Sequence, residues 1–143
     1  MIERISPEEA KRRLDAGWTY VDVRSVPEFE QGHPAGAYNI PLMHMGPGGM
    51  EPNSEFMGAV EQAFPRDAKL VLGCKTGGRS LRAAEMLSAA GYTQVVDQRA
   101  GWSGARDAFG QLSEKGWEAA GLPASTRAEA GHAWTELAPK KRG

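Results

Sequence analysis

The residues best suited to chemistry surround Cys74, the only cysteine of the chain. This cysteine lies in the stretch Gly73-Cys74-Lys75-Thr76-Gly77-Gly78-Arg79-Ser80. The two central glycines allow a tightly curled backbone. A loop curled in this way before a helix turns several amide N–H groups inward, and the helix dipole adds to their positive potential. Lys75 and Arg79 add two cations. These features lower the free energy of a thiolate, so we expect Cys74 to be a nucleophile.

The segments on either side of this loop predict a strand before it and a helix after it. Residues 69–72 form a short apolar run typical of a strand. Residues 81–90 are rich in helix formers, and Gly91 suits the end of a helix. A lone cysteine is commonly only a small buried apolar side chain. The polar, glycine-rich setting of Cys74 between a strand and a helix favours the reactive interpretation instead.

The composition is that of an ordinary soluble protein. The chain has 143 residues, of which 41% are hydrophobic and 24% charged, with a formal net charge of −1. We expect one domain over residues 1–122 and a polar, partly disordered tail over residues 123–143 that ends in the basic residues Lys140 to Arg142. No basic face suggests nucleic acid as a partner, and no apolar run approaches membrane-spanning length.

The cysteine and histidine content gives three further expectations. One cysteine cannot form an internal disulfide, so we expect a cytoplasmic protein. Any transfer chemistry at Cys74 has no second thiol in the chain, so another molecule must complete the cycle. His33, His44 and His132 lie far apart in the sequence, which gives no ligand spacing for zinc. We therefore expect neither a metal site nor a cofactor, while the oligomeric state stays open.

Strands and helices are expected to alternate along the chain. We predict strands over 2–5, 18–23, 37–40, 69–72 and 92–96, and helices over 7–16, 54–64 and 81–90. A single helical turn is expected over 26–32, an irregular loop over 42–53, and one or two helices over 105–120. This order predicts an α/β fold with a largely parallel sheet, whose ligands sit at the carboxyl ends of the strands. Asp22 and Arg24 leave a strand end and are expected on the same rim as Cys74.

Several of these segments together resemble the rhodanese homology domain. The N-terminal signature is carried by Asp22-Val23-Arg24, Glu28-Phe29, the run from Gly32 to Ala37, and Asn39-Ile40-Pro41; Gly91-Tyr92 and Gly101-Trp102 resemble the C-terminal signature. The match covers roughly residues 2 to 120 and is most similar to the single-domain thiosulfate sulfurtransferases of bacteria and plants. It implies a five-stranded parallel sheet flanked by helices on both faces. It also implies that the cysteine takes a sulfane sulfur from a donor such as thiosulfate as a persulfide. An acceptor, cyanide in an assay or a thiol in cells, then removes that sulfur.

The resemblance and the loop chemistry together suggest a role for each residue. Cys74 is the expected sulfur carrier. The backbone amides from Lys75 through Thr76, Gly77 and Gly78 to Ser80 are expected to cradle the anion, and Arg79 with Lys75 to attract the donor. Ser80 is expected either to donate a hydrogen bond to the sulfur or to cap the helix. Asp22, Arg24, Glu28 and His33 are expected to support the site, with Arg24 paired to Glu28 and His33 satisfying a turn.

Departures from the family pattern leave some questions open. Two-domain thiosulfate enzymes have an arginine where the alignment places Glu28, which predicts weaker donor binding here. Arg99 stands where a glycine is usual, and the sequence allows it to face either the pocket or solvent. The 42–53 loop, with its three methionines, follows the signature turn and is expected to border the pocket, where it would select the donor.

Three other functions compete with sulfur transfer to a small acceptor. A cysteine phosphatase or arsenate reductase needs five residues between cysteine and arginine, and only four separate Cys74 from Arg79. Such a short loop fits a sulfur atom better than a phosphoryl group. A non-catalytic docking module usually lacks the cysteine, which this chain retains. A sulfur relay fed by a protein partner would use the same loop and differ only in its donor.

Overall fold

A five-stranded parallel sheet forms the centre of the structure, a computed structural model that describes residues 2–139. Its strand order is β1 (Glu3–Ile5), β8 (Gln94–Gln98), β7 (Lys69–Gly73), β2 (Thr19–Asp22) and β4 (Tyr38–Asn39). Every pairing in this sheet is parallel. The structure thus confirms the predicted α/β fold, and it places β7, which precedes Cys74, in the middle of the sheet.

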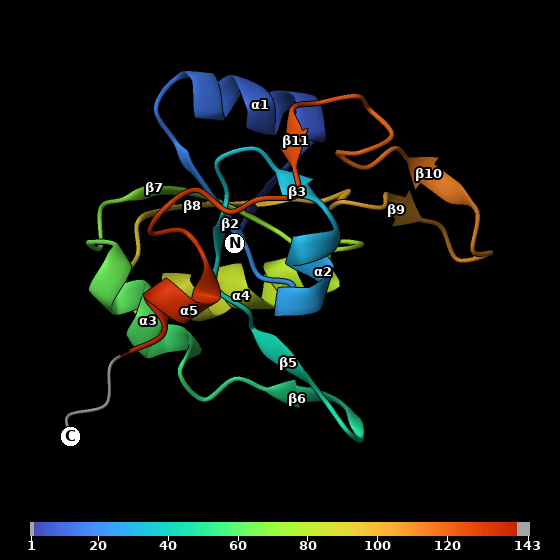
Figure 1. Cartoon of the computed structure of the whole chain (residues 1–143). Helices are drawn as coiled ribbons and strands as arrows, with labels where there is room; N and C mark the ends of the chain where they lie inside the picture. The colour runs from blue at the N-terminus through green and yellow to red at the C-terminus, as the bar shows by residue number, and fades with distance from the viewer. Residues whose placement is uncertain (1, 140–143) are drawn as a thin grey trace.

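Helices cover both faces of the sheet, because successive side chains of a buried strand point to opposite sides. Leu70 and Leu72 of β7 join the larger apolar cluster with α3 (Phe56–Ala63) and α4 (Gly78–Ala89), whereas Val71 joins the smaller cluster with α1 (Pro7–Asp15). Figure 1 shows α1 above the sheet and α3 and α4 below it.

The helix ends follow the sequence signals closely. Ser6 caps α1 by accepting a hydrogen bond from the Glu9 amide at 3.1 Å, with Pro7 in the first helical position. The helix expected to start at Ser54 begins later, at Phe56. A separate turn precedes it, in which the Asn53 side chain accepts from the Glu55 amide at 3.0 Å and the Asn53 carbonyl accepts from the Phe56 amide at 3.2 Å.

The stretch expected to be an irregular loop over residues 42–53 forms a hairpin. Strand β5 (Met43–Gly46) pairs with the antiparallel strand β6 (Gly49–Pro52), and Met45 lies opposite Met50. The expectation was wrong because the many glycines suggested an irregular backbone. Instead, Pro47-Gly48 provides a tight two-residue turn between the strands.

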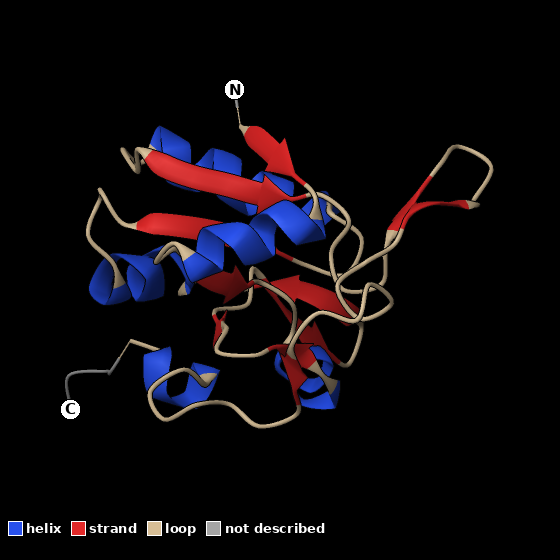
Figure 2. Cartoon of the chain, turned by 90° about the horizontal axis from the view of Figure 1, so that it is seen from above, coloured by secondary structure: helices blue, strands red, loops and turns tan. Residues whose placement is uncertain are grey.

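The helix expected over residues 105–120 is also absent from the structure. Strands β9 (Ala105–Arg106) and β10 (Leu112–Glu114) form a hairpin that projects from the body, as both cartoons show (Figures 1 and 2). The Asp107 carboxylate accepts hydrogen bonds from the amides of Phe109 and Gln111 at 2.8 and 3.0 Å. This turn chemistry at the tip overrides the modest helix propensity of the segment.

Residues 124–139 return to the body of the protein, which the expectation of a polar tail did not anticipate. Strand β11 (Ala124–Ser125) pairs with β3 (His33–Pro34), which follows α2 (Val26–Gln31). The short helix α5 (Trp134–Leu137) packs two of its side chains, Trp134 and Leu137, against the larger apolar cluster. Lys140 to Arg142 lie outside the described residues. No helix between residues 2 and 139 has the length and apolar character needed to cross a bilayer.

Trp117 joins the returning chain to the sheet. Its indole is buried, packs edge-to-face on Tyr20 with centroids 5.4 Å apart, and donates to the Pro123 carbonyl at 2.8 Å. We therefore expect Trp117→Ala to lower the free energy of unfolding by about 3 to 5 kcal/mol in urea denaturation. Phe109→Ala is the matched control, because Phe109 is 89% exposed at the hairpin tip, and its effect should stay within about 0.5 kcal/mol. Equal effects of the two changes would contradict this packing.

Candidate active site

The Cys74 loop connects the central strand to the start of a helix. Cys74 directly follows β7, and α4 begins four residues later, with Gly77 in the position before the helix. The Cys74 side chain is only 2% exposed. Its sulfur accepts a hydrogen bond from the Gly77 amide, with N and Sγ 3.1 Å apart. Since the helix starts at Gly78 rather than Leu81, Arg79 and Ser80 belong to its first turn, and the helix N-terminus faces the sulfur.

The shape of the loop is fixed from outside by the segment that follows β8. The carbonyl oxygens of Cys74 and Lys75 accept hydrogen bonds from the amides of Trp102 and Ser103, at 2.8 and 2.9 Å. A Cβ atom on Gly101 would lie 2.5 Å from the Lys75 carbonyl oxygen, so only glycine fits there. Gly77 has φ +103° and would clash with the Arg99 carbonyl oxygen if it had a side chain. With its carbonyls held outward, the loop directs the Gly77 amide hydrogen toward the sulfur, and of the amides expected to form a cradle this is the one that donates to it in the described residues.

Arg79 is paired with a carboxylate rather than free to meet an anion. Its two terminal nitrogens donate to the two Glu28 oxygens at 2.8 and 3.0 Å. Burial opposes ionisation of Glu28, but the hydrogen bonds from Arg79 and Ser25 outweigh it and lower the pKa of Glu28 to about 2. The same ion pair raises the pKa of Arg79. The expected pairing of Arg24 with Glu28 is therefore wrong, and the neutralised pair ties α2 to the cysteine loop.

Arg24 instead forms a buried pair with Asp22, as their shared strand end allows. The Arg24 Nη2 atom lies 2.8 Å from Asp22 Oδ2 and 2.6 Å from the Gly32 carbonyl oxygen, and both side chains are nearly fully buried. The guanidinium also lies over the Trp102 ring, 5.1 Å from its centroid. Asp22 and Arg24 thus hold the rim of the site and join α2 to the segment that shapes the loop.

His33 acts in the fold, as its place in a turn suggested. Its ring stacks on Phe29 with centroids 3.6 Å apart, and its nitrogens lie 2.7 and 3.2 Å from the carbonyl oxygens of Phe29 and Arg127. The buried imidazole therefore bridges α2 and the returning chain near β11.

Lys75 and Thr76 form the exposed part of the loop. Lys75 lies at the edge of a hollow of about 270 Å³ that Arg24, Glu28, Trp102 and Glu118 also line. Within residues 2–139, no carboxylate comes within ion-pair distance of Lys75. Of the two loop cations that the sequence offered, Lys75 is the one whose charge stays available to an incoming anion.

Ser80 contacts the sulfur but also a residue that sequence reasoning missed. Its Oγ lies 3.4 Å from Cys74 Sγ, 3.4 Å from the Gly77 carbonyl oxygen and in hydrogen-bond contact with Asp97 Oδ1. Asp97 is fully buried in β8, and Arg4 donates to its other oxygen at 2.8 Å. The available sequence signal was a charged residue directly after the two valines of the predicted strand. Arg99, whose direction was open, pairs with Glu114 of β10 at 2.9 Å.

The structure places no cluster of metal ligands near this loop. Between residues 2 and 139, no three His, Cys, Asp or Glu side chains gather closely enough to hold an ion. The candidate site consists of the Cys74 loop with its buried sulfur and the carboxylates of Asp22, Glu28 and Asp97, each paired with an arginine.

Comparison with known proteins identifies the domain. The profile of the family described as Rhodanese, Rhodanese-like domain, matches residues 6–108. The chain belongs to the rhodanese-like family. It is 43% identical over 90 residues to thiosulfate sulfurtransferase 16, chloroplastic, of Arabidopsis thaliana, which covers 63% of this chain and 75% of that protein. It is 37% identical over 103 residues to thiosulfate sulfurtransferase 18 of the same plant, covering 71% of this chain and 76% of the relative.

Solved structures agree with the rhodanese-like fold. Rv0390 from M. tuberculosis superposes with a TM-score of 0.72 at 28% identity, covering 87% of this chain and 98% of that one. A thiosulfate sulfurtransferase from Pseudomonas aeruginosa superposes with a TM-score of 0.60 at 25% identity, over 86% of this chain but only 20% of its own length. The names of these relatives support a sulfurtransferase-type function for rhodanese-like domains of this kind.

The ion pair between Glu28 and Arg79 predicts a pH-dependent stability. A pKa depressed in the folded protein contributes stability above the unfolded-state value of about 4.5 and loses it as the pH falls toward 2. We expect Glu28→Gln to lower the free energy of unfolding by about 1 kcal/mol at pH 7. In urea denaturation, this difference from the natural protein should shrink steadily below about pH 4.5.

The control for this rhodanese-like domain is Glu61→Gln, which removes the exposed pair between Glu61 and Arg66 on the surface. That change should lower the free energy of unfolding by about 0.5 kcal/mol or less at every pH. A Glu28→Gln effect that stays constant from pH 7 to pH 3 would show that the carboxylate charge contributes nothing.

Proposed function

We propose that this protein transfers a sulfane sulfur from an anionic donor such as thiosulfate to a thiophilic acceptor, with Cys74 carrying the sulfur as a persulfide. The observation that carries this proposal is the hydrogen bond from the Gly77 amide to Cys74 Sγ, at the N-terminus of α4. A sulfur held in this way is stabilised as an anion both before and after it accepts a second sulfur atom.

The proposed cycle has two displacement steps. The Cys74 thiolate attacks the outer sulfur of thiosulfate, the sulfur–sulfur bond of the donor breaks, and sulfite leaves with the electron pair. An acceptor nucleophile then attacks the terminal sulfur of the persulfide. Cyanide leaves as thiocyanate, or a thiol becomes a persulfide, and the Cys74 thiolate is restored. Because the chain has one cysteine, the acceptor comes from another molecule.

The loop suits this chemistry through its size and its charge. The Gly77 amide donates to the sulfur, and the carbonyls of Cys74 and Lys75, which accept from Trp102 and Ser103, hold the loop in this shape. Lys75 is exposed at the mouth and attracts the donor dianion. Glu28 already neutralises Arg79, so the attraction for a free dianion is weaker than the sequence alone suggests. A cytoplasmic location belongs to the same proposal.

The test of this function is the intact mass of the protein after incubation with thiosulfate. We expect a gain of one sulfur atom that is lost on addition of cyanide, with thiocyanate released. Cys74→Ser should abolish both the mass gain and the thiocyanate. Serine differs from cysteine by one atom, so we expect the variant to keep the fold, and circular dichroism checks this.

Other outcomes of this experiment separate the competing functions. Uptake of sulfur from a protein persulfide, with none from thiosulfate, would replace the small-molecule donor by a relay. No sulfur uptake from either source would overturn the proposal and leave a docking role. Hydrolysis of a phosphate ester by the natural protein but not by Cys74→Ser would favour the phosphatase alternative.

The charge of Lys75 gives a further prediction for donor selection. We expect Lys75→Gln to lower the second-order rate constant of sulfur loading from thiosulfate about three- to tenfold at low ionic strength, and less at high salt. Lys69→Gln is the matched control, since Lys69 lies at the opposite end of β7, roughly 16 Å from Cys74. An equal decrease of the rate constant in both variants, or a decrease that salt does not change, would show that Lys75 does not attract the donor.

A further inference from the structure

The Ser80 hydroxyl has a single proton but lies near three acceptors, one of which is the Gly77 carbonyl oxygen at 3.4 Å. Ser80 is fully buried in the first turn of α4. Its Oγ bonds to the Asp97 carboxylate on one side and lies 3.4 Å from Cys74 Sγ on the other. A serine hydroxyl has one hydrogen to donate and lone pairs to accept with. It cannot donate to an anionic carboxylate and an anionic sulfur at the same time.

The groups around Asp97 both favour and oppose its ionisation. Strand β8 packs against β1, β7 and α4, and the groups that meet the carboxylate from them are Arg4 and Ser80, with Cys74 just after β7. Burial raises the pKa of Asp97, although the hydrogen bonds from Ser80 and Arg4 oppose this. Arg4 also donates to the Gly77 carbonyl at 3.3 Å, which links the carboxylate to the cysteine loop.

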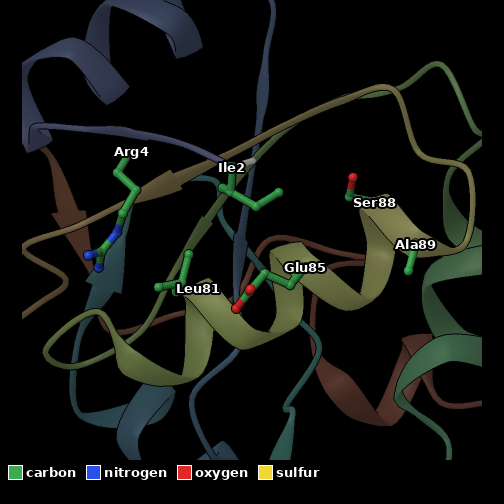
Figure 3. Close-up of a pocket in the computed structure, with 6 residues that line it drawn as sticks. All are labelled: Ile2, Arg4, Leu81, Glu85, Ser88 and Ala89. Carbon is green, nitrogen blue, oxygen red and sulfur yellow. The ribbon is translucent and has the colours of Figure 1, made fainter.

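Arg4 also connects the buried carboxylate with solvent. Its side chain is 40% exposed. It lies at one end of an open hollow of about 520 Å³ between β1 and α4, which Leu81 and Glu85 also line (Figure 3). The carboxylate of Asp97 is therefore bound on its solvent side by a permanently charged guanidinium and on its inner side by the Ser80 hydroxyl.

We propose that Asp97 is a positioning residue that directs the Ser80 hydroxyl and thereby controls how readily Cys74 holds a negative charge. While Asp97 is ionised, Ser80 donates to it and presents lone pairs to the sulfur, which suits a thiol and disfavours a thiolate or persulfide. When Asp97 is neutral, Ser80 donates to the sulfur and stabilises the anion. This inference deepens the proposed sulfur transfer and rests on it for its biological meaning, because each step of that cycle begins or ends on an anionic sulfur.

The test measures the rate of Cys74 alkylation by iodoacetamide against pH, which needs no sulfur donor. In Asp97→Asn, the amide donates to Ser80 Oγ and releases the hydroxyl proton to the sulfur. The pH midpoint of alkylation should then fall by about one unit. In the double variant Asp97→Asn with Ser80→Ala, the fall should be less than about 0.3 units relative to Ser80→Ala alone. An equal fall in both backgrounds would mean a direct charge effect and would overturn the proposal.

Ser80→Ala alone gives a second test if Asp97→Asn does not fold. Because the ionised carboxylate already holds the hydroxyl proton, this variant should keep the midpoint within about 0.3 units of the natural protein. An upward shift of about one unit would mean that Ser80 donates to the sulfur throughout, and would overturn the proposal. Asp67→Asn is the matched control, because Asp67 is exposed near the start of β7, and its midpoint should not move.

This inference and the proposed function fail in different ways. The pH midpoints of alkylation can shift as expected while thiosulfate transfers no sulfur to Cys74. In that case the Asp97 and Ser80 pair still controls the thiol, and only the assignment of thiosulfate as the donor is wrong. If sulfur loads through Cys74 but the double variant shows the full shift, the transfer function stands and the role of Asp97 is wrong.

Discussion

The attachment of the Cys74 loop to the segment after β8 is the constraint on which the site depends. Two backbone amides, those of Trp102 and Ser103, bind the carbonyls of Cys74 and Lys75. These bonds turn the carbonyl dipoles away from the sulfur, so that the amide of Gly77 points toward it. The segment keeps its own shape because Gln98 accepts hydrogen bonds from the amides of Ala100 and Gly101 at 2.8 Å. A buried amide side chain thus supports the loop from behind.

The arginines around this loop are paired with carboxylates, and within the described residues only Lys75 of the two loop cations keeps its charge available. Asp22 neutralises Arg24, Glu28 neutralises Arg79, and Asp97 is met by Arg4. Stabilisation of an anionic sulfur therefore falls mainly to backbone amides and the α4 N-terminus, which cannot be neutralised. Such a site depends on geometry more than on charge. The groups that set this geometry at the sulfur are the Gly77 amide and the Ser80 hydroxyl.

The returning C-terminal segment and the β9–β10 hairpin frame the site from two sides. Residues 124–139 bury the edge of β4 through Trp134 and Leu137 and receive the imidazole of His33. The hairpin is anchored near the loop by the pair of Arg99 with Glu114, while its tip with Phe109 is exposed. Both elements add to the compact five-stranded domain and shape the approach to the loop rather than the loop itself.

The sequence alone determined the parts of this protein that depend on local chemistry. Periodicity and composition predicted the parallel strands, the helices between them, and the position of Cys74 between a strand and a helix. These features follow from near neighbours in the chain. The two hairpins were missed because each rests on a short turn inside a segment of weak periodicity. Pro47-Gly48 makes one turn, and the Asp107 side chain stabilises the other.

The tertiary structure alone decided which charges meet. Arg24 had two carboxylates within reach in the sequence, and the geometry gave it Asp22 and left Glu28 to Arg79, which lies 51 residues away. Asp97 and Ser80 come together only because β8 lies beside β7 in the sheet, so no spacing in the sequence indicated their contact. The reason is physical: a buried ion pair forms where the desolvation of both partners is offset, and that depends on strand order and burial rather than on residue type.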